Sequence, residues 1–439
     1  MKLSLSLSLL LLAVFSTSHA LVPPLLQAVK VQKAITRKAF FAGAVTGAAV
    51  ATTLGTAGVA VAAATQTQNA NNNPYKIYMP PAGSMDGKLV VITGGSTGLG
   101  LESAKRLAAA GATIVLTSRT PAKGQAAVSQ VQQYLSQSGV ENKNIYSLVL
   151  DLDDLESVRQ FPKSFEKLSL SSKTIDVLMN NAGVMAIPDL EKTKDGYERT
   201  FQSNHLGHFV LTAELFPYLN RQNGGATVIN VSSLAYQFAG KGLDLENLPD
   251  PKAKYGPWTS YGQSKLANIL FTQELQRRAD AASGEQWLTA VTLHPGAVQT
   301  DLGRYLIGEE KWQTMKENGL PKGVEGFLMQ TMASFTKTVP EGASTQVYLA
   351  SGADGNNKNL IKGAFYDECR PKTLPKWATS QSDAKALWEE SERLANITFD
   401  LTASSTTSST KEDVKLASAA PAASDEEPST DSDTTTSSS

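Results

Sequence analysis

Residues that build metal and disulfide sites are scarce in this sequence. It contains one cysteine, Cys369, and four histidines, the first of which, His19, lies in an apolar N-terminal stretch. A single cysteine excludes an internal disulfide framework and a cysteine-rich zinc module. So few histidines leave little material for any other metal site, and we predict none.

Net charge is also nearly absent, but it is unevenly distributed. The chain of 439 residues has a formal charge of -1. Residues 1–75 contain five basic residues and no acid, whereas residues 399–439 contain eight acids and two lysines. The remaining body, residues 76–398, is therefore neutral. A neutral body argues against a nucleic-acid partner, because a nucleic-acid-binding surface is basic.

Residues 1–20 have the composition of a secretory signal peptide. Lys2 supplies the charged start, and residues 3–15 form a leucine-rich stretch too short to span a bilayer. Ser18 and Ala20 are small residues at the two positions that a signal peptidase reads. The alternative is an apolar N-terminus that is not cleaved.

Residues 21–82 combine a transit segment, an apolar segment and a polar linker. Residues 21–38 are basic and acid-free, as in organelle transit sequences. Residues 39–64 are 26 uncharged positions, long enough to cross ~30 Å of hydrocarbon as a helix. They are either a membrane anchor or a second cleavable signal. The layout resembles the layered targeting of algal plastids of secondary origin, so we expect entry into the secretory pathway and a plastid or other endomembrane location, with membrane association left open.

Residues 399–439 form a tail that is rich in Ser, Thr, Asp and Glu and has almost no large apolar side chains. Such a segment cannot bury enough apolar surface to offset the entropy lost on ordering. We therefore predict that this acidic tail is disordered and that the folded domain spans residues 83–398.

Within residues 83–398, strand patterns alternate with helix patterns. Short apolar runs rich in β-branched residues predict strands at 88–93, 112–117, 145–150, 175–179, 226–231 and 288–293. Helical patterns separate them, including residues 98–110, 198–219 and 261–278. This alternation predicts an α/β domain with a single Rossmann-type, doubly wound parallel sheet.

A glycine-rich turn, Thr93-Gly94-Gly95-Ser96-Thr97-Gly98-Leu99-Gly100, joins the first predicted strand to the first predicted helix. Glycines permit a tight turn and a close backbone approach to a pyrophosphate, and a helix N-terminus offers free N–H groups to it. An ordinary turn is the alternative, but the flanking strand and helix favour nucleotide binding. The predicted contacts are Gly94, Ser96, Thr97, Gly98, Leu99 and Gly100.

The end of the second predicted strand indicates which dinucleotide binds. An NAD site usually has a carboxylate about 20 residues beyond the glycines, on the ribose 2′-hydroxyl. Here that place is taken by Arg119, with Lys123 close behind and no acid nearby. A guanidinium suits a 2′-phosphate, so we predict NADP(H), with a solvated surface arginine as the alternative.

Two more motifs complete a family pattern. Asn180-Asn181-Ala182-Gly183 follows the fourth strand, and Tyr261-Gly262-Gln263-Ser264-Lys265 lies on a predicted helix. With the glycine-rich turn, they resemble the short-chain dehydrogenase/reductase family. Further segments look like its retinol dehydrogenase and WW-domain oxidoreductase subgroup: residues 204–209, 232–235, 264–268, 293–296, 366–369 and 384–389. The related light-dependent protochlorophyllide reductases match less well after the fourth strand, where this chain continues with Val184-Met185.

Tyr261 and Lys265 are four residues apart on a helix and therefore share a face. An ammonium beside a phenol should lower the phenol's pKa toward the working range. The family resemblance implies that Tyr261 exchanges a proton with the substrate and that Lys265 also holds the nicotinamide ribose. It further implies that Ser233 polarises the substrate carbonyl and that Asn204 holds a relay water.

The resemblance also implies further cofactor contacts. They are Asp151 on the adenine, Asn181, Ala182 and Gly183 after the fourth strand, and Pro295, Gly296, Val298 and Thr300 near the nicotinamide. Capping of a helix is an alternative role for Asp151. Core packing or helix capping, rather than metal binding, is the interpretation for His205 and His208, and packing is the interpretation for Cys369.

Apolar and aromatic side chains are frequent in residues 303–340, where the family places its substrate lid. They suit a lipophilic substrate but equally suit helices packing on the body. We therefore expect an NADP-dependent oxidoreductase that acts on a lipophilic carbonyl or alcohol. The alternatives are a light-dependent protochlorophyllide reductase-like enzyme and a non-catalytic NADP-binding scaffold. The oligomeric state is not predicted.

Overall fold

The computed structural model describes residues 77–222, 224–251, 255–283, 286–298, 336–355 and 360–402. The predicted signal peptide, transit and apolar segments up to residue 76 lie outside these residues, as do Thr300, most of the predicted lid and the tail beyond residue 402. No helix among the described residues is long and apolar enough to cross a membrane.

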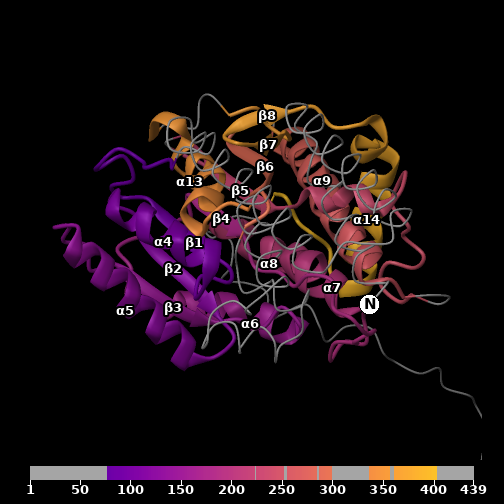
Figure 1. Cartoon of the computed structure of the whole chain (residues 1–439), viewed down its shortest axis with the longest axis horizontal. Helices are drawn as coiled ribbons and strands as arrows, with labels where there is room; N and C mark the ends of the chain where they lie inside the picture. Colours follow the sequence, from indigo (N-terminus) through magenta and orange to yellow (C-terminus); the bar gives the residue numbers. More distant parts are fainter. Residues whose placement is uncertain are drawn as a thin grey trace, which may run out of the picture.

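One eight-stranded sheet runs through the body in the order β3-β2-β1-β4-β5-β6-β7-β8 (Figure 1). The strands are β1 (Leu89–Ile92), β2 (Thr113–Ser118), β3 (Ile145–Val149), β4 (Val177–Asn180), β5 (Ala226–Val231), β6 (Leu288–His294), β7 (Phe365–Asp367) and β8 (Arg370–Lys372). Neighbouring strands pair in parallel as far as β7, and only β8 is antiparallel to its neighbour. The predicted Rossmann-type, doubly wound parallel sheet is confirmed.

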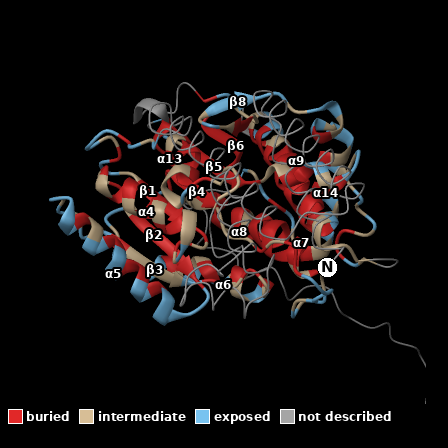
Figure 2. Ribbon diagram, in the orientation of Figure 1, coloured by how far each residue is buried: buried red, intermediate tan, exposed pale blue. Residues whose placement is uncertain are grey.

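Helices cover both faces of this sheet. They are α4 (Gly98–Ala109), α5 (Pro121–Gln137), α6 (Leu155–Glu166), α7 (Arg199–Phe201), α8 (Gly207–Leu215), α9 (Pro257–Ser283), α13 (Val339–Gly355) and α14 (Gln381–Ala395). Helices α4, α5 and α13 share one apolar cluster with one side of the sheet. Helices α6, α8, α9 and α14 share another with the opposite side. Figure 2 shows the buried strands between these two layers.

The strands β7 and β8 were not predicted, for a physical reason. Each is three residues long, and all three residues of β8 are exposed, so neither forms an apolar run. Glu368 and Cys369 join them with positive φ angles of 51° and 60°. This left-handed turn lets β8 fold back on β7 at the edge of the sheet.

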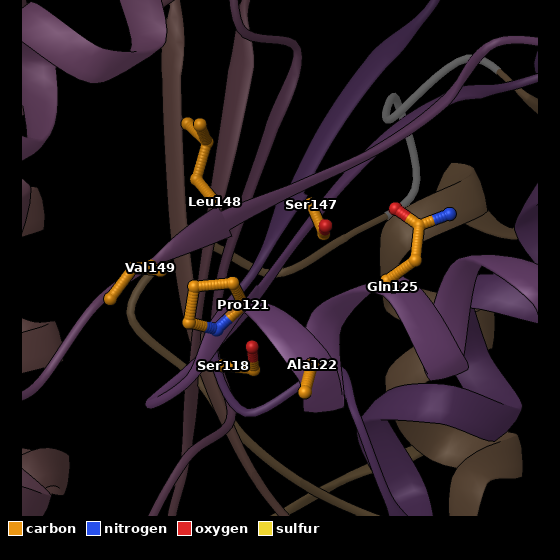
Figure 3. A pocket seen from close by; sticks show the side chains of 7 residues that line it. All are labelled: Ser118, Pro121, Ala122, Gln125, Ser147, Leu148 and Val149. Atoms are coloured by element: carbon orange, nitrogen blue, oxygen red, sulfur yellow. The ribbon is translucent and has the colours of Figure 1, made fainter.

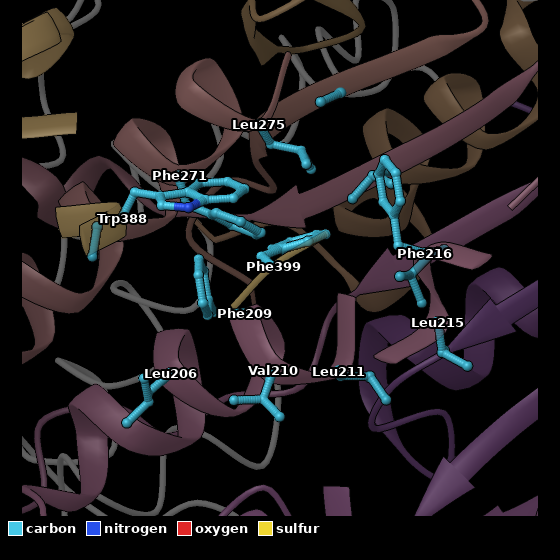
Figure 4. Packing of buried hydrophobic residues seen from close by; sticks show 14 of the residues in the cluster. Leu206, Phe209, Val210, Leu211, Leu215, Phe216, Phe271, Leu275, Trp388 and Phe399 are labelled. Carbon is cyan, nitrogen blue, oxygen red and sulfur yellow. The ribbon is translucent and has the colours of Figure 1, made fainter. Parts of the chain in front are cut away.

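The folded body extends past both predicted limits. Phe399, which was assigned to the disordered tail, is only 4% exposed and stacks on Trp388 at 4.8 Å between ring centroids (Figure 4). Tyr78, which was assigned to the linker, packs edge-on against Tyr348 at 5.3 Å. Each flanking segment is mostly polar, so its composition does not reveal the one aromatic side chain whose packing offsets the entropy lost on ordering.

Candidate active site

The glycine-rich loop lies between the end of β1 and the start of α4, and its geometry requires small residues. Gly94 and Gly98 have φ angles of +62° and +54°, which L-residues with a side chain rarely adopt. A Cβ on Gly95 would lie 2.5 Å from the Cβ of Leu116, and a Cβ on Gly100 would lie 2.5 Å from the carbonyl oxygen of Gly94. The predicted tight turn is therefore present.

The N-terminus of α4 can receive an anion. Thr97 is the N-cap residue, but its side chain makes no capping hydrogen bond, and the first turn contains no acidic residue. The helix therefore presents free N–H groups and the positive end of its dipole beside the glycine loop. Ser96, Thr97 and Leu99 lie in this turn and are partly or fully exposed. The loop suits the pyrophosphate of a dinucleotide.

The loop after β4 packs directly against the glycine loop. The backbone N–H groups of Asn181 and Ala182 donate to the Thr93 hydroxyl oxygen at 2.9 and 3.0 Å. The Asn181 amide nitrogen donates to the Thr93 carbonyl at 2.8 Å. A Cβ on Gly183 would lie 2.9 Å from Oδ1 of Asn204, so this loop also reaches the predicted catalytic residues.

Asn204 lies in a π-helical turn, Gln202–Leu206, where a single continuous helix was expected. Its Oδ1 accepts a hydrogen bond from Val184 N at 2.8 Å. Its Nδ2 donates to Val184 O at 3.0 Å and to Ser264 Oγ at 2.9 Å. The side-chain amide is thus bonded to protein on both sides, and a water link from Asn204 to Lys265 stays a prediction.

The structure brings Ser233, Tyr261 and Lys265 together at the ends of β5 and α9. Lys265 Nζ lies 5.6 Å from the centroid of the Tyr261 ring and donates to Val231 O at 3.0 Å. Ser233 lies close enough to Tyr261 to affect the pKa of its phenol. Tyr261 and Lys265 are only 6% and 4% exposed. The predicted shared helix face is therefore confirmed in geometry.

Burial, rather than the neighbouring lysine, controls the ionisation of this group. It raises the pKa of Tyr261 to about 12, against a smaller lowering by the nearby Ser233. It also lowers the pKa of Lys265 to about 7. The prediction that Lys265 lowers the pKa of Tyr261 is wrong for this structure, because desolvation disfavours the charged form of both groups.

The residues predicted around the adenosine follow the ends of β2 and β3. Arg119 is exposed directly after β2, where a 2′-phosphate could be reached. Asp151 follows β3 and accepts a hydrogen bond from Asp153 N at 3.1 Å. The alternative capping role for Asp151 is wrong: the N-cap of α6 is Asp154, whose carboxylate accepts from the N–H groups of Glu156 and Ser157.

A hollow of about 360 Å³ lies between β2, β3 and the start of α5 (Figure 3). Its lining was not predicted to have a function and consists of Ser118, Pro121, Ala122, Gln125, Ser147, Leu148 and Val149. None of these side chains is titratable, so the hollow contains no acid or base of its own.

The segment Pro295–Val298 follows β6 and contacts a residue that sequence reasoning missed. Val298 pairs with Lys337, and Lys337 N donates to Ala297 O at 2.7 Å. Gly296 has a φ of +97°, and a Cβ there would lie 2.6 Å from Cδ of Lys337. The buried Lys337 side chain thus lies directly against the predicted nicotinamide loop.

His294 is a second residue that sequence reasoning missed. Its Nδ1 accepts a hydrogen bond from Leu234 N at 3.2 Å, one residue beyond Ser233. Burial lowers the pKa of His294 to about 4, so the ring is neutral at pH 7 and can act as this acceptor. Its place directly before Pro295-Gly296 was the available sequence signal.

The sheet, the glycine loop and the helix N-terminus define a nucleotide-binding α/β protein. Residues 88–244 match the family model described as short chain dehydrogenase. Retinol dehydrogenase 14 of Mus musculus is 35% identical over 320 residues, covering 72% of this chain and 88% of the relative. Retinol dehydrogenase 12 of Homo sapiens is 34% identical over 318 residues, covering 72% and 89%.

Among solved structures, an uncharacterised protein from Mycobacterium paratuberculosis is similar, with a TM-score of 0.53 and 32% identity. The match covers 74% of this chain and 100% of that one. The chain belongs to the short-chain dehydrogenase/reductase family and is an oxidoreductase. The predicted resemblance to retinol dehydrogenases is confirmed.

Proposed function

We propose that this oxidoreductase transfers hydride between NADP(H) and a lipophilic carbonyl or alcohol. The observation that carries the proposal is the buried pair Tyr261 and Lys265, with the half-buried Ser233 beside it at the end of β5. This group lies next to Gly183 and Asn204, which approach each other from the loop after β4 and from the π-helical turn. Burying a phenol and a lysine together costs free energy, and buried ionisable side chains of this kind are typical of catalytic sites.

When bound, the nicotinamide cofactor supplies the hydride. The glycine loop and the N-terminus of α4 would hold its pyrophosphate, and Lys265 with the segment after β6 would hold its nicotinamide end. Ser233 would donate a hydrogen bond to the substrate oxygen and polarise the carbonyl. Tyr261 would then donate its phenolic proton to that oxygen as the carbonyl becomes an alcohol.

The ionisation of the site supports the reductive direction at neutral pH. Because burial raises the pKa of Tyr261 to about 12, the phenol is protonated at pH 7 and can serve as the acid. The reverse reaction needs the phenolate, which is scarce at that pH. Alcohol oxidation should therefore accelerate as the pH rises toward 10, while carbonyl reduction should not.

The choice of NADP(H) and of a lipophilic substrate rests on two separate observations. Arg119 occupies the place in the sequence of the carboxylate that would bind an NAD ribose, and its side chain is exposed. The similar proteins are named as retinol dehydrogenases, which suggests a lipophilic alcohol or aldehyde.

The experiment is NADPH consumption in the dark by the purified chain with a panel of apolar aldehydes and ketones. We expect turnover of at least one substrate, and no turnover by Tyr261→Phe. Turnover only in the light with a tetrapyrrole would instead favour a protochlorophyllide reductase-like activity. NADPH binding without turnover in either condition would favour the scaffold alternative.

We further propose that residues 1–76 deliver the protein through the secretory pathway to a plastid or another endomembrane compartment. The support is the order of apolar, basic and apolar segments in the sequence. A fluorescent protein fused after residue 76 should reach that compartment, and one fused after residue 20 alone should not be retained there. Carbonate extraction of the full chain would distinguish an anchor from a cleaved segment.

A further inference from the structure

Two histidines three residues apart have different surroundings, although both are buried. His205 contacts the rings of Phe201, Phe209 and Phe271 at centroid distances of 5.5, 6.2 and 5.8 Å. His205 also has one polar partner, the Ser391 hydroxyl at 3.0 Å from Nε2, whereas both ring nitrogens of His208 have a protein partner. The two side chains therefore offer a matched comparison of a packing histidine with one built into the active site.

The partners of His208 determine which of its nitrogens carries the proton. Nδ1 lies 3.0 Å from the carbonyl oxygen of Asn204, which can only accept, so Nδ1 is the donor. Nε2 is then an acceptor, and it lies 2.9 Å from the Thr93 hydroxyl. The other acceptor near that hydroxyl, the Met179 carbonyl, is more distant at 3.4 Å. Thr93 therefore donates to His208.

On one side, the bond between Thr93 and His208 orients the loop after β4, which contains Asn181 and Ala182 and is called the cofactor loop below. With its proton directed at His208, the Thr93 hydroxyl oxygen can accept the N–H groups of both Asn181 and Ala182, at 2.9 and 3.0 Å. Without His208, the hydroxyl proton would have only the more distant Met179 carbonyl as an acceptor, at 3.4 Å. The loop after β4, which packs on the glycine loop, would then lose a fixed partner.

On the other side, His208 is connected to the catalytic helix. It holds the Asn204 carbonyl inside the π-helical turn at 3.0 Å. The Asn204 amide donates to Ser264 Oγ at 2.9 Å, and Ser264 Oγ donates to the Tyr261 carbonyl at 2.8 Å. A continuous set of buried hydrogen bonds thus runs from the glycine loop to the backbone of Tyr261.

We propose that His208 is a positioning residue that couples the cofactor loop to the catalytic residues through a single, Nδ1-protonated tautomer. The coupling of catalysis rests on the proposed function, whereas the coupling to the cofactor loop does not. Burial lowers the pKa of His208 to about 4, which keeps the ring neutral and the tautomer fixed at neutral pH. His208 touches neither substrate nor the reacting atoms; it acts through Thr93 and Asn204.

Two substitutions of His208 remove its two hydrogen bonds one at a time. Asparagine reaches about as far as Nδ1, so His208→Asn can keep the bond to the Asn204 carbonyl and loses the bond to Thr93. Glutamine reaches about as far as Nε2, so His208→Gln can keep an acceptor for Thr93 and loses the bond to Asn204. The matched control is His205→Asn, which removes an equally buried imidazole from the same part of the chain.

The measurements are the NADPH dissociation constant, followed by protein fluorescence, and steady-state kinetics. We expect His208→Asn to bind NADPH about tenfold more weakly, the effect of one unsatisfied buried partner. We expect His208→Gln to bind NADPH within about twofold of the parent and to lose about tenfold in kcat. His205→Asn should unfold at a lower temperature, with NADPH binding and kcat within about twofold of the parent.

Nitrogen-15 NMR of histidine-labelled protein provides an independent readout. The His208 resonances should show a protonated Nδ1 and an unprotonated Nε2 at pH 7. An Nε2-protonated ring, or His208→Asn that binds NADPH as the parent does, would overturn the proposal. If the parent binds NADPH but reduces no substrate, the proposed function fails, while the NADPH and NMR results still decide the role of His208.

Discussion

The two faces of the sheet differ in what they pack and in what they contribute to the site. The face with α4, α5 and α13 is lined by Ala, Val, Leu, Ile and two Met side chains, and Tyr366 is the only buried aromatic residue in its described cluster. The opposite face contains a large aromatic cluster: Phe161, Phe165, Phe201, Phe209, Phe216, Tyr236, Phe271, Trp287, Phe365, Trp388 and Phe399. The glycine loop leads into α4 on the first face, and the proposed catalytic residues Tyr261 and Lys265 lie on α9 of the second.

This difference follows from what each part of the site needs. A phosphate-binding turn needs close approach of backbone to backbone, which small aliphatic side chains permit. The proposed catalytic group needs polar side chains held in a buried place. Asn204, Lys265 and His208 are each at most 4% exposed, and burying them costs free energy that the surrounding apolar packing offsets.

The largest expected effect is on catalysis. It comes from Lys265, on α9 of the face with the aromatic cluster (called the aromatic face below). Lys265→Met should lower kcat by about 10³-fold, because a buried proton-transfer partner contributes about 10²–10⁴-fold. The free energy of unfolding should stay the same or rise, because a buried ammonium is replaced by an apolar side chain of similar length. Steady-state kinetics and urea unfolding of the same preparation check both parts. A loss of activity that parallels a loss of stability would contradict this role.

The next effect is on stability alone. Phe209 is fully buried, with Phe271, Trp388 and Phe399 at centroid distances of 5.4, 5.1 and 5.6 Å. Phe209→Ala should reduce the free energy of unfolding by about 3–5 kcal/mol. Val131→Ala, on α5 of the other face, should cost less because it removes fewer buried atoms. Equal costs for both substitutions would remove the contrast between the two faces.

A feature of this structure can be predicted from the sequence when it depends on residues close together in the chain, and cannot when it depends on distant ones. Apolar periodicity located β1 to β6, and the glycine pattern located the turn before α4, because both depend on neighbours in the chain. The π-helical turn at Asn204 and the burial of Phe399 depend on distant partners, which no local pattern shows. The pKa of Tyr261 was predicted with the wrong sign because the spacing to Lys265 is visible in the sequence and the desolvation is not.

Mild acid should lower the free energy of unfolding, because two histidines are buried on the aromatic face. Burial lowers the pKa of His205 to about 3 and of His208 to about 4, from about 6.5 in the unfolded chain. As the pH falls below 6.5, the unfolded chain binds protons that the folded protein does not. Stability should therefore fall, by about 2 kcal/mol for each histidine at pH 5. Urea unfolding from pH 7 to pH 5 measures this, and His205→Phe should reduce the slope; an unchanged slope would count against a neutral, buried His205.

The smallest expected effect is on the preference between NADPH and NADH, and it concerns Arg119, between β2 and α5. Arg119→Asp should raise the KM for NADPH by about 10–100-fold, the contribution of one or two charged hydrogen bonds, and should lower the KM for NADH. Lys385→Asp, on the exposed side of α14, should change neither value. If Arg119→Asp leaves the KM for NADPH unchanged, Arg119 is a solvated surface residue.

The most direct test of the account compares Tyr261→Phe with the parent chain for NADPH binding and for NADPH-dependent carbonyl reduction in the dark. The substitution removes one hydroxyl and leaves the ring that packs edge-on near Trp258 at 6.3 Å. We expect an NADPH dissociation constant within about twofold of the parent and a kcat lower by about 10³-fold or more. A variant that keeps a tenth or more of the parent's kcat would contradict the assignment of Tyr261 as the proton donor.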